Sequence, residues 1–88
     1  YSEEKAYNQQ YYSVLQKLEK YEKRVNTLSR DEFKAEKQTN RFQTFKQVSR
    51  QLRRLPNPYK DEETKVTSDD VKDILKLDIQ LNRNLFAD

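Results

Sequence analysis

The sequence predicts an all-α fold, a small antiparallel three-helix bundle, on three observations. Apolar residues recur at spacings of three and four, the period of a helix that buries one side. Glycine, which most readily adopts the positive φ angles of tight β-hairpins, is absent from all 88 residues. With 33% hydrophobic and 38% charged residues, order depends on this pattern. A self-associating coiled-coil hairpin is the alternative, because regular seams can also pair between chains.

The first helix is expected over residues 3–27. Ser2 is placed to cap it, and acidic residues in the first turn suit the helix dipole. Its seam follows spacings of 4, 3, 4 and 3, and three of the five seam positions are tyrosine: Tyr7, Tyr11, Val14, Leu18 and Tyr21. We expect Tyr7, Tyr11 and Tyr21 to fill a core that is short of aliphatic residues, with their hydroxyls near water.

The second helix is expected over residues 30–55. Ser29 and Glu32 form a capping box, and Leu28 with Phe33 forms a hydrophobic staple. The alternative is one uninterrupted helix through Ser29. The pattern is weakest between Lys34 and Arg41, where fraying is expected. The expected seam is Ala35, Gln38, Phe42, Phe45, Ser49 and Leu52, flanked by Val48 and Leu55.

Residues 56–66 form the predicted linker, and the third helix is expected over 68–86. Pro56 and Pro58 end the second helix because each lacks an amide donor. Thr67 or Ser68 caps the third helix, whose apolar residues cover most of its circumference. A helix of this kind sits between two neighbours or faces a partner. The three helices and the linker make up one domain over residues 1–88.

The composition argues against an enzyme. The chain has no cysteine and no histidine, so thiolate and imidazole metal sites, cysteine nucleophiles and the usual general base are excluded. No cofactor, metal site or catalytic residue is predicted, and no apolar run approaches the ~20 residues of a membrane span. Asp78, near the apolar face of the third helix, is expected to pair with a basic residue such as Arg41 or Lys34.

The second helix is strongly basic. Residues 29–55 carry eight basic and three acidic groups, whereas residues 56–88 carry five basic and eight acidic. Lys46, Arg50, Arg53 and Arg54 share one side and could contact phosphates. A nucleic-acid-binding module is therefore the alternative function. The plainer interpretation is a solvated face attracted to the acidic third segment.

The leading prediction is a non-enzymatic protein–protein interaction domain that binds through helix faces. Tyr12 lies off the first seam among amide side chains, and tyrosine is favoured in binding surfaces. The expected contacts are Tyr11, Tyr12 and Gln16 on the first helix and Arg50, Arg53 and Arg54 on the second. A purely structural segment that forms homo-oligomers is a further alternative.

In composition the chain resembles the small, cysteine-free, lysine-rich helical bundles of surface and secreted binding modules in Gram-positive bacteria. This resemblance implies an extracytoplasmic or surface-exposed place and supplies no site residue. Because the chain begins at Tyr1 and contains no methionine, we expect a mature or excised piece of a longer protein.

Overall fold

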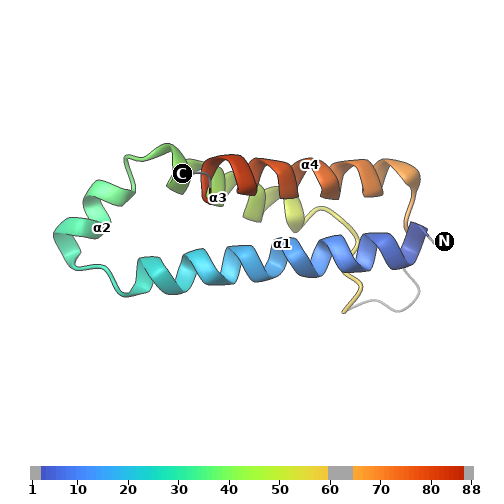
Figure 1. Ribbon diagram of the computed structural model, residues 1–88, viewed down its shortest axis with the longest axis horizontal. Coiled ribbons are helices and arrows are strands. Elements are labelled where there is room, and N and C mark those ends of the chain that lie inside the picture. The colour runs from blue at the N-terminus through green and yellow to red at the C-terminus, as the bar shows by residue number, and fades with distance from the viewer. Residues whose placement is uncertain (1–2, 60–64, 87–88) are drawn as a thin grey trace.

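The computed structural model describes residues 3–59 and 65–86, and within these ranges all regular structure is helical. The helices are α1 (Glu3–Asn26), α2 (Arg30–Glu36), α3 (Asn40–Leu52) and α4 (Ser68–Asn84) (Figure 1). The fold is therefore the small all-α bundle that the sequence predicts. The predicted cap Ser2 and linker residues 60–64 lie outside the described residues.

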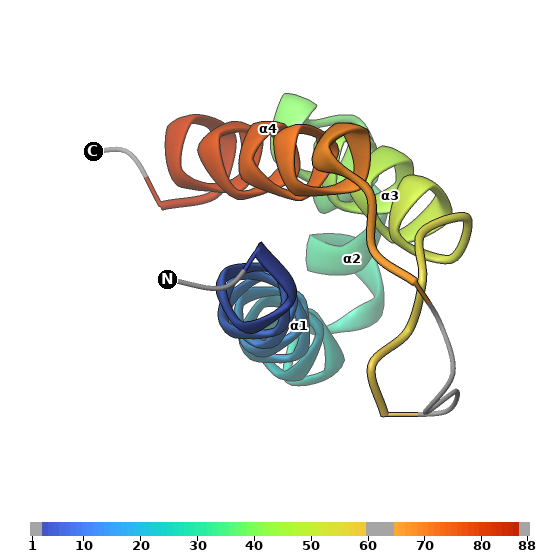
Figure 2. The same ribbon diagram turned by 90° about the vertical axis from the view of Figure 1, so that its right-hand side faces the viewer.

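The bundle has an up-down-up arrangement. Helices α1 and α4 lie side by side and run in the same direction, while α3 runs opposite to both (Figures 1 and 2). Contacts between side chains fix this arrangement. Lys17 of α1 pairs with Asp78 of α4 at 2.6 Å, and Asn40 at the start of α3 donates to Asn84 at the end of α4 at 3.0 Å. Helix α4 packs on both α1 and α3, so it connects the other two long helices of the bundle.

The core side of α1 is the predicted one, and all five seam residues from Tyr7 to Tyr21 are buried. The Tyr7 hydroxyl donates to the backbone carbonyl of Pro56. The Tyr21 hydroxyl donates to Oε1 of Glu36 at 2.6 Å. Each of these two tyrosines therefore fills core volume with its ring while its polar tip finds a partner, as buried tyrosines require.

The bond between Tyr21 and Glu36 shifts the titration of both groups. Burial, with a smaller contribution from this bond, raises the pKa of Tyr21 to about 12. The same bond holds the pKa of the Glu36 carboxyl below its usual value, with help from Arg41, whose Nη2 donates to Glu36 Oε2 at 3.0 Å. Burial likewise raises the pKa of Tyr7. The phenols are thus held neutral and the carboxylate charged.

The second predicted helix is interrupted, so the prediction of a continuous helix over residues 30–55 was wrong. Helix α2 ends at Glu36, and α3 starts after Thr39, whose Oγ1 accepts from the Phe42 amide at 3.2 Å. The same hydroxyl donates to the Glu36 carbonyl at 2.6 Å. Thr39 therefore bonds to both helix ends, and the break falls within the stretch where the pattern is weakest. The capping box at the start of α2 is confirmed, because Ser29 and Glu32 bond each other's backbone amides.

The seam of α3 also differs from the predicted one. The buried residues are Thr44, Val48 and Leu52, whereas Phe42, Phe45 and Ser49 are only partly buried. Ala35 and Gln38, which the prediction placed on the seam, are exposed. The prediction placed Phe42 and Phe45 on the buried side because they are the largest apolar residues of this segment. The side of α3 that meets α4 is instead marked by a threonine and a valine.

Helix α4 begins where the sequence predicts, but its Asp78 pairs with a different residue from those expected. Thr67 and Asp70 form a capping box at its start. Asp78 pairs with Lys17 and not with Arg41 or Lys34, and Ser13 Oγ also donates to it at 3.3 Å. Arg41 is held instead by Glu36. The expected pairing was wrong because α1, rather than the second segment, lies against this side of α4.

Candidate protein-binding surface

Helix α4 exposes two large apolar side chains on one side, and a third lies two residues beyond its end. Its buried row consists of Ile74, Leu77 and Leu81, with Leu85 following the helix. Leu75, Ile79 and Phe86 keep 41%, 50% and 38% of their surface exposed, and we name them the α4 stripe. Leu75 and Ile79 are four residues apart, so they are neighbours on the helix surface. The bundle core does not account for this second apolar row.

The α4 stripe borders the outer side of α1. Asp78 holds Lys17 and Ser13 at the contact between the two helices, one residue before Ile79. Further along, Lys20 Nζ lies 5.6 Å from the centre of the Phe86 ring, within range of a cation–π contact. On α1 this side carries a shallow hollow of about 390 Å³, lined by Ser13, Gln16, Lys17, Glu19, Lys20 and Lys23.

Tyr12 and Gln16, two of the predicted contact residues, lie at the edge of this hollow. Half of the Tyr12 surface is exposed, and its hydroxyl accepts a 2.6 Å hydrogen bond from Gln16 Nε2. Gln16 itself lines the hollow. We call the region formed by Tyr12, the hollow and the α4 stripe the α1–α4 surface.

Tyr11, a third predicted contact residue, is in the core. It is 5% exposed, and its ring centre lies 5.9 Å from that of Tyr7 and 6.1 Å from that of Tyr59. Burial raises the pKa of its hydroxyl. The structure therefore places Tyr11 with the seam residues and not on the α1–α4 surface.

The predicted basic residues of α3 lie elsewhere and divide into two sets. Lys46, Arg50 and Arg53 line an open hollow of about 490 Å³ between the end of α1, α2 and α3. The same hollow includes three aromatic rings, Phe33, Phe42 and Phe45. Lys46 Nζ lies 5.8 Å from the Phe42 ring centre. This hollow combines apolar rings with positive charge.

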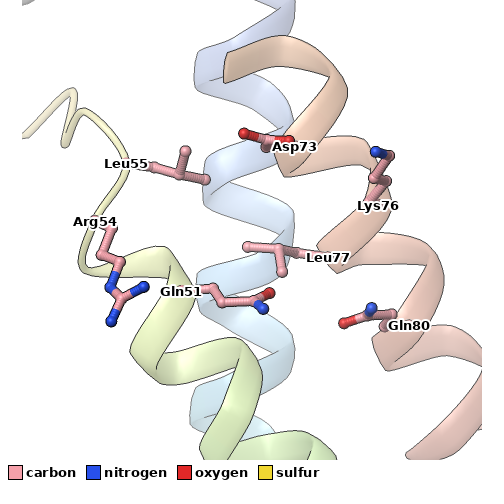
Figure 3. A pocket seen from close by; sticks show the side chains of 7 residues that line it. All are labelled: Gln51, Arg54, Leu55, Asp73, Lys76, Leu77 and Gln80. Atoms are coloured by element: carbon pink, nitrogen blue, oxygen red, sulfur yellow. The ribbon is translucent and has the colours of Figure 1, made fainter. Parts of the chain in front are cut away.

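Arg54 is separated from that set. It lines a different hollow, of about 330 Å³, between α3 and α4 (Figure 3). Leu55 and Leu77 line it together with the amides Gln51 and Gln80 (Figure 3). Arg54, which follows α3, and Asp73 of α4 both line it. Arg54 therefore lines a different hollow from Lys46, Arg50 and Arg53.

Within residues 3–59 and 65–86, no group of three or more acidic side chains is placed to hold a metal ion. No helix in these ranges has the length and apolar character needed to cross a membrane.

No family model, curated protein or solved structure matches this chain. The case for its function therefore depends on the chain's own surface.

The sequence-based prediction missed the α4 stripe as a candidate site. The signal was present, because apolar residues around most of a helix exceed what one buried side needs. Which of them face outward follows only once α1 and α3 take their places against α4.

Proposed function

We propose that this chain is a non-enzymatic protein–protein interaction domain that binds its partner through the α1–α4 surface. The observation that carries the proposal is the α4 stripe. Two large apolar side chains of α4, and a third two residues beyond its end, are each about 40–50% exposed, while the buried side of α4 completes the core. Contiguous exposed apolar residues with a polar rim are typical of protein-binding sites.

The composition of the remaining surface supports the same proposal. Tyr12 offers a large ring whose hydroxyl is already bonded to Gln16, so the side chain is partly ordered before any partner arrives. Ordering a side chain in advance reduces the entropy lost on binding. Aromatic residues with a polar tip are also enriched among the residues that contribute most to binding.

The test compares capture by the parent chain with capture by an Ile79→Asp variant. Proteins retained from an extract are identified, purified and titrated against both chains by calorimetry. The substitution places a charge in the centre of the stripe, so we expect affinity to fall by about a hundredfold or more. Gln47→Asp, an equal change of charge at an exposed position of α3, is the matched control and should bind like the parent.

Circular dichroism shows whether the Ile79→Asp variant keeps its fold, since Ile79 is half exposed. A purified partner that binds the parent and the folded Ile79→Asp variant equally well would remove the α1–α4 surface from the proposal.

A nucleic-acid-binding module is the second candidate, and the hollow beside α2 favours it. Basic side chains there surround aromatic rings, and single-stranded nucleic acids bind by phosphate contacts combined with stacking. Titration of a fluorescent oligonucleotide at rising salt tests this candidate, because phosphate binding weakens steeply between roughly 50 and 200 mM. Substitution of Lys46, Arg50 and Arg53 by alanine should abolish binding, whereas Arg54→Ala should not. Equal binding by parent and triple variant would exclude it.

A further inference from the structure

We infer that the α1–α4 surface receives an acidic amphipathic helix of another protein, laid along α1 and α4. This inference rests on the proposed function and specifies the partner. The docked helix would lie on the side of these two helices away from α3 and would complete a four-helix bundle.

The geometry of the surface suits a helix. Helices α1 and α4 pack on each other and run in the same general direction, with α4 inclined to α1 (Figures 1 and 2). From Leu75 to its end at Asn84, α4 spans about 14 Å at 1.5 Å per residue, and Phe86 lies two residues beyond that end. That length matches about three turns of a partner helix. Apolar residues at spacings of three and four on the partner would meet the stripe, as in other helix-in-groove complexes.

The charges around the stripe select an acidic partner. On α4, Lys72 precedes Leu75 by three positions and Arg83 follows Ile79 by four, so both adjoin the stripe. On the α1 side, Lys20 and Lys23 line the hollow.

Acidic groups are fewer on this surface. Glu19 lines the hollow, and Asp78 is already bound by Lys17. The rim is therefore positive on both sides of an apolar strip. Carboxylates that flank the apolar row of a docked helix would meet opposite charge on each side.

The same charges disfavour the other occupants. A second copy of the chain would bring its own Lys72 and Arg83 against these residues, and like charges in contact oppose association. A membrane-bound helix needs an apolar face broad enough to insert into the headgroup boundary. Here three half-exposed side chains lie beside the amide of Gln16 and the charged hollow.

The experiment uses the ¹⁵N-labelled chain and two synthetic helical peptides of about 18 residues. Both peptides carry the same leucines at spacings of three and four. One has glutamate and the other lysine at the flanking positions. We expect the glutamate peptide to shift the amide signals of residues 13–20 and 75–86 and to bind at least about tenfold more tightly than the lysine peptide.

Charge reversal provides the matched control. The double substitution Lys72→Glu and Arg83→Glu should reverse the preference between the peptides by about tenfold or more. The double substitution Lys46→Glu and Arg50→Glu changes net charge equally on α3 and should leave the preference in place. Equal loss of binding in both double variants would show attraction by net charge alone and would overturn the inference.

Further outcomes separate this inference from the proposed function. Equal binding of both peptides on residues 13–20 and 75–86 overturns the acidic partner and leaves a protein-binding surface. Binding to phosphatidylserine vesicles with neither peptide bound overturns it in favour of a lipid surface. A dimer in sedimentation that Ile79→Asp dissociates assigns the stripe to a second copy. Failure of the proposed function is a different result, namely a purified partner that ignores Ile79→Asp.

Discussion

The aromatic residues of α1 and those of α2 and α3 occupy positions opposite to what their polarity suggests. Tyr7, Tyr11 and Tyr21 carry hydroxyls, and yet none is more than 5% exposed. The wholly apolar rings of Phe33, Phe42 and Phe45 are only partly buried. They contact one another at the edge of the bundle, with ring centres 5.9 Å apart for the first pair and 6.2 Å for the second.

This contrast shows that helix position, more than side-chain polarity, decides where a ring lies. Helix α1 packs along α4 and against the segment after α3, so a seam residue there is covered whatever its type. The hydroxyls then need partners, which Pro56 provides for Tyr7 and Glu36 for Tyr21. Phe33 lies before the break after Glu36 and Phe42 and Phe45 lie after it, and all three rings are only partly buried. The first region depends on hydrogen bonds within its core, and the second depends on contacts between rings.

We expect the largest effect from alkaline pH, which should destabilise the core that contains the buried tyrosines of α1. Tyr7 and Tyr21 have raised pKa values when folded and ordinary values near 10 when unfolded, so their contribution to stability is full below pH 10. It is lost as the pH rises from about 10 toward 12, because the unfolded chain then releases protons that the folded chain retains. We expect helical circular dichroism to disappear in that range as tyrosinate absorbance appears.

Lysines also lose charge in this range, at a pKa near 10.4. A Tyr21→Phe variant controls for them because it lacks one of the buried phenols and keeps every lysine. Its free energy of unfolding should fall less steeply than that of the parent above pH 10. Identical slopes would mean that the buried tyrosines do not determine the alkaline limit.

Truncation of one ring from each region should give the next largest effect. Tyr7 is fully buried, so Tyr7→Ala removes a large side chain from the core and should cost about 3–5 kcal/mol in urea unfolding. Phe33 is partly buried beside Phe42, and Phe33→Ala should cost about 1 kcal/mol. If Phe33→Ala were the more damaging change, the phenylalanine contacts would be the true centre of the core.

Removal of a single hydroxyl should separate buried tyrosines from exposed ones. Tyr21→Phe keeps the ring and deletes the bond to Glu36, whose side chain is 12% exposed, so we expect a loss of about 1.5–3 kcal/mol. Tyr12→Phe deletes a bond to Gln16 at the surface and should change stability by less than about 0.5 kcal/mol. Thermal unfolding of both variants measures the difference, and equal effects would contradict the assigned role of Glu36.

Features set within one helix could be predicted from the sequence. The seam from Tyr7 to Tyr21 repeats regularly over four spacings, the capping box at Ser29 joins two residues three apart, and Thr67 is one of the two caps predicted for α4. These signals are local, and one stretch of chain contains all of each. Tyr12 was separated from the seam by the same local geometry, and the structure shows it half exposed.

Features that depend on pairing between helices could not be predicted. The partner of Asp78 is Lys17, sixty-one positions away along the chain, and only the parallel packing of α1 on α4 brings them together. The buried side of α3 contains a threonine, which a search for apolar spacing passes over. The α4 stripe illustrates the same point, since its residues are as apolar as the buried ones of α4 and only the neighbouring helices decide which are covered.

The break between α2 and α3 provides the smallest and most local test of the comparison. Thr39 caps α3 through the Phe42 amide, without the acidic third residue that would have made a recognisable capping box. Thr39→Ala should therefore cost about 1 kcal/mol. Thr27→Ala is a matched control, because its hydroxyl donates to the Arg24 carbonyl after α1 and caps no helix start, so a smaller loss is expected. Urea unfolding and helical circular dichroism measure both.

The direction of the dichroism change in Thr39→Ala shows whether Thr39 or Glu36 keeps α2 and α3 apart. A small loss of helix with the loss of stability means that the cap orders α3 and that the break persists without it. A gain of helix in Thr39→Ala would mean that α2 and α3 join once the hydroxyl is gone. In that case the threonine itself, rather than the bonds of Glu36 to Tyr21 and Arg41, would keep the two helices apart.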